Sequence, residues 1–297
     1  MLFLISVFPW IRSYSVHIVR RKCLTAPAPA VWGSTYLVTT EMLPAGYPMT
    51  VAMLRALPAG LLLMLFIRQL PKGIWWGRIF VLGALNFAVF WWLLFVSAYR
   101  LPGGVAATVG AIQPLIVLLL SRMVLGNVLK PLAVIGALCG IGGVALLLLT
   151  PQAKLDTIGI IAGLAGAFSM AAGTVLSRRW QPDVSPLTFT TWQLTAGGLL
   201  LLPVSLLLEP ALPPLTLLNI SGLLYLGLIG AALTYLFWFR GLAILGPNSV
   251  ASLGFLSPLT AVLLGWFVLD QQLSLLQCAG VIVVIGSVWL SQVANRR

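Results

Sequence analysis

The chain has 297 residues, of which 60% are hydrophobic and 7% charged, and its formal net charge is +12. About a quarter of the residues in soluble domains are charged, so this composition excludes a water-soluble globular protein and a separate soluble catalytic domain. The basic residues stand between apolar segments and form no single patch, which argues against nucleic acid as a partner. The partner that the composition predicts is the lipid bilayer.

Ten apolar segments follow one another along the chain. Each holds about 20 residues, the length with which a helix crosses the hydrocarbon core of a bilayer. Residues 1–23 lack the basic start and the small-residue cleavage site of a signal peptide, and we expect them to form an N-terminal extension outside the fold. In chain order the segments span 24–42, 48–67, 79–98, 104–125, 131–149, 157–177, 187–208, 217–239, 245–269 and 273–293.

The Lys and Arg residues predict how these helices are oriented. With the N-terminus on the inner side, 14 of the 17 Lys and Arg residues flank inner helix ends, whereas only Arg100 and Lys154 flank outer ends. Basic residues are retained on the cytoplasmic side of a membrane. Both termini are therefore expected in the cytoplasm, with the chain in the inner (plasma) membrane.

The sequence repeats itself at an offset of 144 residues, which aligns Gly110 with Gly254 and Pro114 with Pro258. Residues 24–150 and 157–294 are thus predicted to be two repeats of five helices each. Because five is odd, the second repeat crosses the bilayer upside down. The predicted fold is an all-α integral membrane protein with about ten transmembrane helices in two inverted repeats, as in secondary transporters, whose substrate site lies between the repeats.

Four segments carry a resemblance to a known family: VWGSTYLVTTEMLP (31–44), AMLRALPAGLLLML (52–65), LGALNFAVFWWLLFVSAYRLPGGVAATVGAIQPLIVLLLSRMVLGNVL (82–129) and GPNSVASLGFLSPLTAVLLGWFVLDQQLSLLQCAGVIVVIG (246–286). They resemble the EamA-type branch of the drug/metabolite transporter superfamily, and within it the PecM-like proteins. The resemblance implies ten helices, two EamA repeats, an inner-membrane location and efflux of compounds such as amino acids or pigments. PecM-like proteins are associated with pigment export and with the regulation of pectinase, cellulase and blue-pigment production.

Aromatic and polar side chains share faces of the predicted helices. On the first segment they recur at i, i+3, i+4 and i+7, which places them on one helix face. An aromatic box with a few polar groups suits an aromatic or zwitterionic solute, although aromatic side chains also fill cores and line membrane interfaces. The candidate pathway residues are Trp32, Thr35, Tyr36 and Thr39 on the first segment, Asn86 on the third and Trp238 on the eighth.

The fourth and ninth segments each place a proline after a polar residue, in Gln113-Pro114 and Ser257-Pro258. A proline inside a helix frees a backbone carbonyl and kinks the helix. We expect a pair of gating kinks with Gln113 and Ser257 in the pathway; the alternative is ordinary packing of two kinked helices.

Arg55 is the one charged residue well inside a predicted span. An intramembrane arginine indicates a functional site, and here it could extend outward, pair with Glu41 or attract a substrate carboxylate. The five acidic residues all lie at helix ends or in loops. Glu41, at the outer end of the first helix, is therefore the candidate for proton coupling, and facilitated diffusion or exchange is the alternative.

The sequence predicts no cofactor and no metal site. It holds one histidine and three cysteines without metal-ligand spacing, and two of the cysteines, in apolar helices, are expected to be small buried side chains. Gly136-xxx-Gly140 and Gly159-xxx-Gly163 permit close helix packing, within the chain or in a homodimer.

Two functions remain open at this point. The first is a secondary exporter of a small metabolite. The second is a membrane-embedded regulator or sensor of pigment and pectinase or cellulase expression that transports nothing. A P-loop is absent from the sequence, which excludes direct pumping by ATP, and no enzymatic activity is expected.

Overall fold

The structure, a computed structural model, describes residues 25–44, 46–101, 109–148, 156–268 and 274–294. Within these ranges the chain forms helices and no strand. Seven helical stretches there are long and apolar enough to cross a membrane, and two shorter apolar helices, Gln113–Leu125 and Pro131–Leu146, accompany them. The chain is therefore a multi-pass helical membrane protein, as the composition predicts.

Every predicted segment coincides with helix in the described part of the chain. The second segment matches α3 at both ends, whereas the eighth continues six residues beyond its predicted end, to Leu245. Residues 1–24, which include the whole predicted N-terminal extension, lie outside the described ranges. The helical elements are α2 (Pro27–Met42), α3 (Pro48–Ile67), α4 (Trp75–Gly83), η1 (Ala84–Ala88), α5 (Val89–Arg100), α7 (Gln113–Leu125), α8 (Pro131–Leu148), α9 (Thr157–Arg179), α10 (Pro186–Leu208), α11 (Leu217–Leu224), η2 (Tyr225–Leu233), α12 (Thr234–Leu245), α13 (Pro247–Leu253), α14 (Leu256–Val268) and α15 (Leu275–Ala294).

The helix starts follow from local sequence. Asp156 caps α9 by accepting a 2.7 Å hydrogen bond from Gly159 N. Ser185 caps α10 in the same way, with Pro186 as its first residue, where the missing proline N–H costs nothing. Each of these caps fixes the residue at which its helix begins after a polar link.

The third and eighth segments each contain a stretch of π-helix, η1 and η2, between two α-helical parts. A π-helix widens the turn and is found mostly at functional sites. Gly230 in η2 lies 144 residues after Asn86 in η1, the offset that relates the two halves in sequence. The two irregular stretches therefore lie at corresponding places.

The fourth and ninth segments are broken instead of kinked. Turn residues 111–112 and 254–255 interrupt them, and new helices begin at Gln113 and Leu256. Pro114 and Pro258 thus stand in the first turn of a new helix. The sequence pattern instead predicts each proline inside one continuous, kinked helix. The physical reason is that the first turn of a helix tolerates a residue without an N–H.

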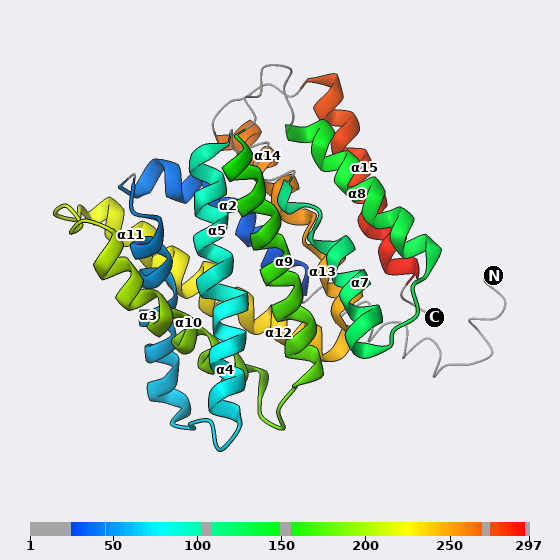
Figure 1. Cartoon of the computed structure of the whole chain (residues 1–297). Helices are drawn as coiled ribbons and strands as arrows, with labels where there is room; N and C mark the ends of the chain where they lie inside the picture. Colours follow the sequence, from blue (N-terminus) through cyan, green and yellow to red (C-terminus); the bar gives the residue numbers. More distant parts are fainter. Residues whose placement is uncertain (1–24, 45, 102–108, 149–155, 269–273, 295–297) are drawn as a thin grey trace, which may run out of the picture.

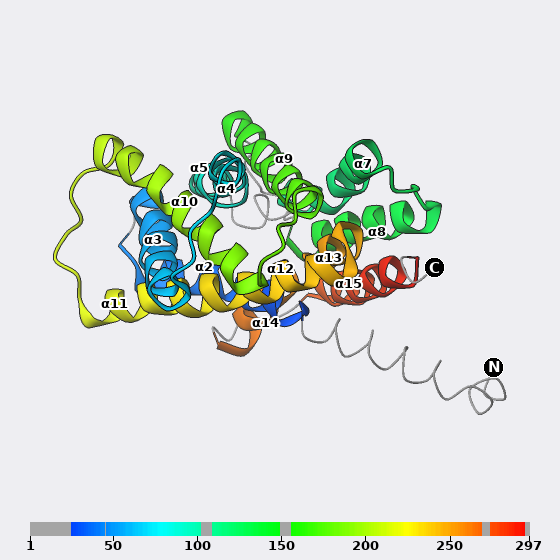
Figure 2. The same ribbon diagram turned by 90° about the horizontal axis from the view of Figure 1, so that it is seen from below.

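The helices form one bundle in which α11, η2 and α12 run obliquely past the others (Figures 1 and 2). The most extensive packing pairs α3 with α10 and α8 with α15, and α9 packs on both α5 and α7. The glycine spacings predicted for close packing contact neighbours within the chain: Gly136 lies against Ser291, Gly140 against Phe255 and Gly159 against Leu101.

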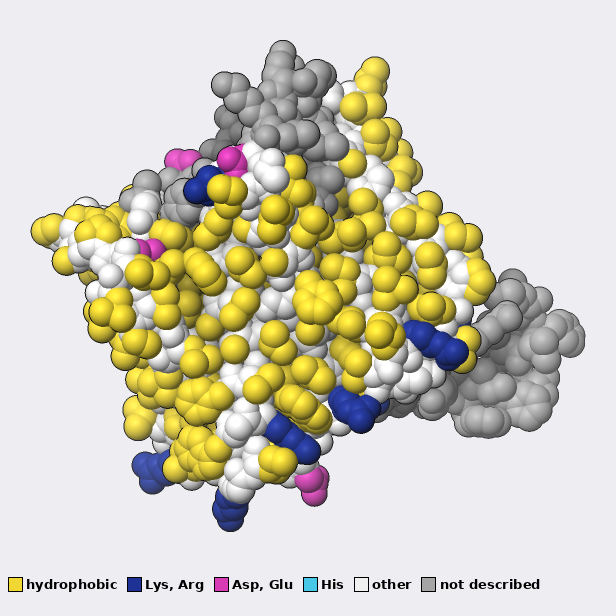
Figure 3. Space-filling view, in the orientation of Figure 1, with side chains coloured by type: hydrophobic (Ala, Val, Ile, Leu, Met, Phe, Trp, Pro, Cys, Tyr) yellow, Lys and Arg dark blue, Asp and Glu magenta, His cyan; other side chains and the backbone are white. Residues whose placement is uncertain are grey.

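The visible outer surface is apolar across its middle, and Lys and Arg gather along the edge where α3 and α9 end (Figure 3). Large apolar side chains are exposed on several helices, as expected of a lipid-facing surface. Phe66 on α3 is 78% exposed and Met123 on α7 is 79% exposed. Cys139 and Cys278 are also exposed, so the expectation that they are buried is wrong. A small apolar thiol is equally stable against lipid, which the apolar sequence pattern cannot distinguish from a core.

Candidate functional site

Seven aromatic side chains form a cluster in the bundle, six of them buried and Trp32 partly buried. Tyr235 is its hub: its ring centroid lies 4.8 Å from that of Trp32, 4.6 Å from Phe87 and 6.1 Å from Trp91. The rings meet at tilted or edge-on angles, the arrangement that aromatic pairs prefer. The aromatic cluster consists of Trp32, Phe87, Trp91, Phe189, Tyr235, Trp238 and Phe239.

Arg55 lies beside this cluster and is only 3% exposed. Its guanidinium stacks on the Trp91 ring at 4.6 Å from the centroid, and Nη2 donates a 2.7 Å hydrogen bond to the Gly230 carbonyl in η2. Of the roles considered from the sequence, outward extension to the membrane surface is therefore wrong. The site holds a permanent positive charge in an aromatic environment, which favours cation–π attraction.

A chain of hydrogen bonds connects the first helix to the same carbonyl. Trp32 Nε1 donates to Thr234 Oγ1 at 2.8 Å, and Thr234 Oγ1 donates to Gly230 O at 2.9 Å. Gly230 O thus receives hydrogen bonds from Arg55 and Thr234 together. Trp32, predicted from the sequence as a pathway residue, is in this way coupled to the position of η2.

A second polar cluster lies around Asn86 in η1. Asn86 Nδ2 donates to Gln193 Oε1 at 2.8 Å and to Ser177 Oγ at 3.1 Å. All three residues are buried. Gly173 makes room for this amide, because an added Cβ there would collide with the Asn86 side chain. We refer to Asn86, Ser177 and Gln193 as the amide cluster.

Several predicted pathway residues keep buried polar atoms without a hydrogen-bond partner in the described part of the chain. These atoms are Thr39 Oγ1, Asn86 Oδ1, Gln113 Nε2 and Trp238 Nε1. A buried polar group without a partner is costly, and a solute or water in a path would supply one. Other buried polar atoms, among them Ser121 Oγ and Thr174 Oγ1, share this property, so it is compatible with a lining but does not set the predicted residues apart.

The remaining predicted residues divide into three groups. Thr35 is half-buried on α2, and Ser257 on α14 lies against Gly33, one residue from Trp32. The side chain of Tyr36 lies outside the described residues. Glu41 is exposed near the end of α2. Of the predicted residues, the structure brings Trp32, Arg55 and Trp238 together at the aromatic cluster, whereas Asn86 belongs to the amide cluster.

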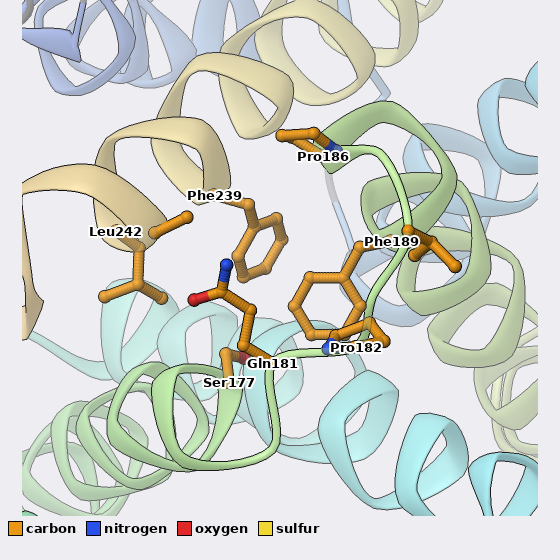
Figure 4. Close-up of a pocket in the computed structure, with 9 residues that line it drawn as sticks. Ser177, Gln181, Pro182, Pro186, Phe189, Phe239 and Leu242 are labelled. Atoms are coloured by element: carbon orange, nitrogen blue, oxygen red, sulfur yellow. The ribbon is translucent and has the colours of Figure 1, made fainter.

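Two cavities open near the basic edge. One of about 60 Å³ lies between the end of α9, the start of α10 and α12, where Phe189 and Phe239 of the aromatic cluster form part of its lining (Figure 4). Arg178 Nη1 donates to Gln181 Oε1 at its rim at 2.9 Å and also to the Ala243 carbonyl. A larger cavity of about 250 Å³ lies between the α3–α4 and α9–α10 loops. We call the first cavity the inner vestibule.

Sequence reasoning missed Gln193, Ser177 and Gly230. One signal was available for Gln193: an offset of 138 residues aligns α3 with α10, matching Pro48 with Pro186 and Gly60 with Gly198. At that offset Gln193 is the counterpart of Arg55. Gly230 offered only its backbone, which no side-chain pattern can reveal.

The fold and the site together define a multi-pass helical membrane protein with a buried centre of aromatic, amide and guanidinium groups. Comparison with known proteins gives its family. Residues 23–149 and again 157–292 match the EamA-like transporter family. The chain belongs to this family and holds two copies of its domain, which confirms the family predicted from the quoted segments.

Two relatives match the chain over most of their own length, and one of them is named as a transporter. The chain is 47% identical over 267 residues to Protein PecM of Dickeya dadantii (strain 3937), covering 89% of this chain and 90% of that protein. It is 29% identical to the uncharacterized inner membrane transporter YedA of Escherichia coli (strain K12), covering 88% and 86%. A solved crystal structure shares the fold, with a TM-score of 0.79 at 20% identity and coverage of 94% and 99%. Family and relatives support a membrane transporter and not an enzyme.

Proposed function

We propose that the chain is a secondary exporter of a small metabolite, working in the inner membrane by alternating access between two inverted five-helix halves. Alternating access needs two similar halves that rock about a central site. The observation that carries the proposal is the way α3 and α10 contact each other.

These two helices contact each other reciprocally. An added Cβ at Gly60 would come 2.6 Å from Thr195 N, and one at Gly198 would come 2.6 Å from Leu57 Cα. The offset of 138 residues relates Leu57 to Thr195 and Gly60 to Gly198, so each contact is the image of the other, as about a two-fold axis. Residue numbers rise along α3 as they fall along α10, so the helices are antiparallel, which supports inverted halves.

Contacts between helix ends agree with the predicted topology. Glu209 and Met49, which hydrogen-bond, belong to two predicted outer ends, and so do Asn219 and Met42. Arg179 donates to the Val124 carbonyl at two predicted inner ends. These pairings support ten spans of alternating direction with both termini in the cytoplasm.

Broken helices in corresponding positions are a feature of substrate sites in secondary transporters. The breaks before Pro114 and Pro258 are related by the offset of 144 residues. They support a path past α7 and α14 in which the two breaks allow these helices to bend as the path opens and closes.

We infer the solute class from the aromatic cluster and its polar groups. Flat rings next to a guanidinium and amides suit an aromatic or zwitterionic compound. The resemblance to PecM-like proteins adds pigments and amino acids to this class, and an influence on pectinase or cellulase production would follow from export of a metabolite that controls expression.

The alternative is a sensor without transport. A sensor would need an output surface, and the described loops between helices are short. The discriminating experiment compares metabolites in supernatants of cells lacking and overproducing the protein, then tests the enriched compound with the purified protein in vesicles. Saturable movement of that compound into protein-containing vesicles but not empty ones is expected. Absence of movement together with altered gene expression would favour the sensor.

A further inference from the structure

The two halves make a reciprocal pair of polar contacts. Arg55 of α3 donates to Gly230 in η2, and Gln193 of α10 accepts from Asn86 in η1. Gln193 is the counterpart of Arg55 at the offset of 138 residues, and Gly230 is the counterpart of Asn86 at the offset of 144. Each half therefore holds the π-helix of the other half through a side chain at the same relative position.

The two contacts lie at opposite depths of the bundle. Arg55 follows the predicted outer start of α3 by seven residues, and Gln193 follows the predicted inner start of α10 by the same number. Seven residues of helix span roughly 10 Å. One contact thus stands in the outer half of the bundle and the other in the inner half, beside Ser177, which lines the inner vestibule.

The π-helices are suited to act as hinges. A π-helical turn and an α-helical turn use different hydrogen-bond partners, and π-helical turns inside α-helices are frequent at functional sites. In η2, the Gly230 carbonyl receives hydrogen bonds from Arg55 and from Thr234, which is itself bonded to Trp32. Release of this carbonyl by Arg55 would remove one of the bonds that fix η2 in place.

The counterparts differ in charge, and this difference gives them different chemistry. Arg55 is a permanent cation whose planar fork can bind a carboxylate through two parallel hydrogen bonds, and a charge-assisted bond of this kind is stronger than a bond to a neutral carbonyl such as that of Gly230. The Trp91 ring holds the plane of the guanidinium. Gln193 is neutral, so an anion gains no comparable advantage there.

We propose that Arg55 and Gly230 form an outer gate that an anionic group of the solute opens by replacing the Gly230 carbonyl on the guanidinium. Gln193 and Asn86 form the corresponding inner gate, which does not respond to charge. The inference rests on the proposed transport function and adds to it the link between solute binding and opening. An exporter with this asymmetry opens outward when it is loaded.

The test uses the full chain in vesicles, in a background without Cys23, Cys139 and Cys278, with one reporter cysteine at a time. Ser34→Cys reports on the outer side, because Ser34 bonds Tyr225 at the start of η2. Leu242→Cys reports on the inner vestibule, which Leu242 lines. A thiol reagent that cannot cross the membrane is applied from each side. The probes are small aromatic carboxylates, starting with benzoate, each paired with its neutral amide.

Carboxylates are expected to raise labelling of the Ser34→Cys reporter about tenfold, the factor that corresponds to one charged hydrogen bond, while the amides leave it unchanged. Arg55→Gln should abolish the response, because glutamine can still donate to Gly230 but carries no charge. Arg55→Lys should restore part of it. Gln193→Asn is the matched control: it should change labelling of the Leu242→Cys reporter and leave the carboxylate response intact.

An equal response in Arg55→Gln, an equal response to the amides, or no response to any carboxylate would overturn the charge-operated gate. Transport itself is tested separately by the two reporters. Suppose that the labelling of the two reporters changes in opposite directions in the background that keeps Arg55 and Gln193, while the carboxylate response is absent. Alternating access is then supported and the charge-operated gate is refuted. If neither reporter ever changes, both proposals fail.

Discussion

Glu209, just after α10 in the second half, holds the start of α3 in the first half, and its removal should have a measurable cost. Its two carboxylate oxygens accept hydrogen bonds of 2.7 Å each from Met49 N and Thr50 N, the first backbone donors of α3. A hydrogen bond to a charged group contributes about 1.5–3 kcal/mol, and a negative charge at a helix N-terminus adds about 0.3–1 kcal/mol. The donors are only half-buried, so water replaces part of this contribution.

For Glu209→Ala we therefore expect a loss of about 2 kcal/mol in the free energy of unfolding, the upper range for a lost cap. That loss corresponds to about a 30-fold change in the unfolding equilibrium. Glu209→Gln, which keeps one acceptor oxygen, should lose about half as much. Asp183→Ala is the control, since Asp183 is exposed in a loop and surface substitutions cost less than about 0.5 kcal/mol.

The assay is detergent-induced unfolding of the purified protein, together with hydrogen exchange at the Met49 and Thr50 amides. Both amides should exchange faster in Glu209→Ala and unchanged in Asp183→Ala. Equal unfolding of the two variants, with no change in exchange, would show that the loop after α10 does not hold α3 and would refute the reasoning.

Three further outcomes are expected. Gly173→Ala should destabilise the fold by about 1–3 kcal/mol, because its methyl group has no room beside the Asn86 amide; unfolding of the purified variant measures this. Pro114→Ala and Pro258→Ala should each change stability by less than about 1 kcal/mol, since a first-turn position makes little use of the restored N–H; cysteine labelling from both sides should still detect both helix breaks. Arg178→Gln should increase labelling of the inner vestibule from the cytoplasmic side, because it weakens the bond to the last turn of α12; unchanged labelling would mean that Arg178 does not close the vestibule.

The positions of the helices follow directly from the sequence. The start of α3 at Pro48 and its end before Arg68 are visible as a proline and a basic residue around an apolar run. The helix breaks in the fourth and ninth segments were anticipated only as kinks, because a proline marks the place of an irregularity but does not say which residues leave the helix.

Site residues can be predicted from the sequence where a residue is unusual for an apolar span or belongs to a periodic helix face. Arg55 is a lone charge in an apolar span, and Trp32 belongs to a periodic face, so both could be chosen from sequence. Gln193 is signalled only by its alignment with Arg55 at the offset of 138 residues, and the π-helices arise from packing that leaves no apolar period to detect. The exposed cysteines show the same limit, since lipid-facing and core positions share one apolar composition.

The reciprocal contacts have a consequence for how the protein is made. Arg55 and Asn86 lie 175 and 107 residues before their partners in the chain. At a synthesis rate of about 5–20 residues per second, each must wait roughly 5 to 35 s in the membrane before its partner emerges. During that time a guanidinium and an amide that end up buried must be satisfied by water, lipid head groups or the insertion machinery. The first half is therefore expected to stay near the site of insertion until α10 and η2 arrive, and assembly of the two halves becomes a step of biogenesis in its own right.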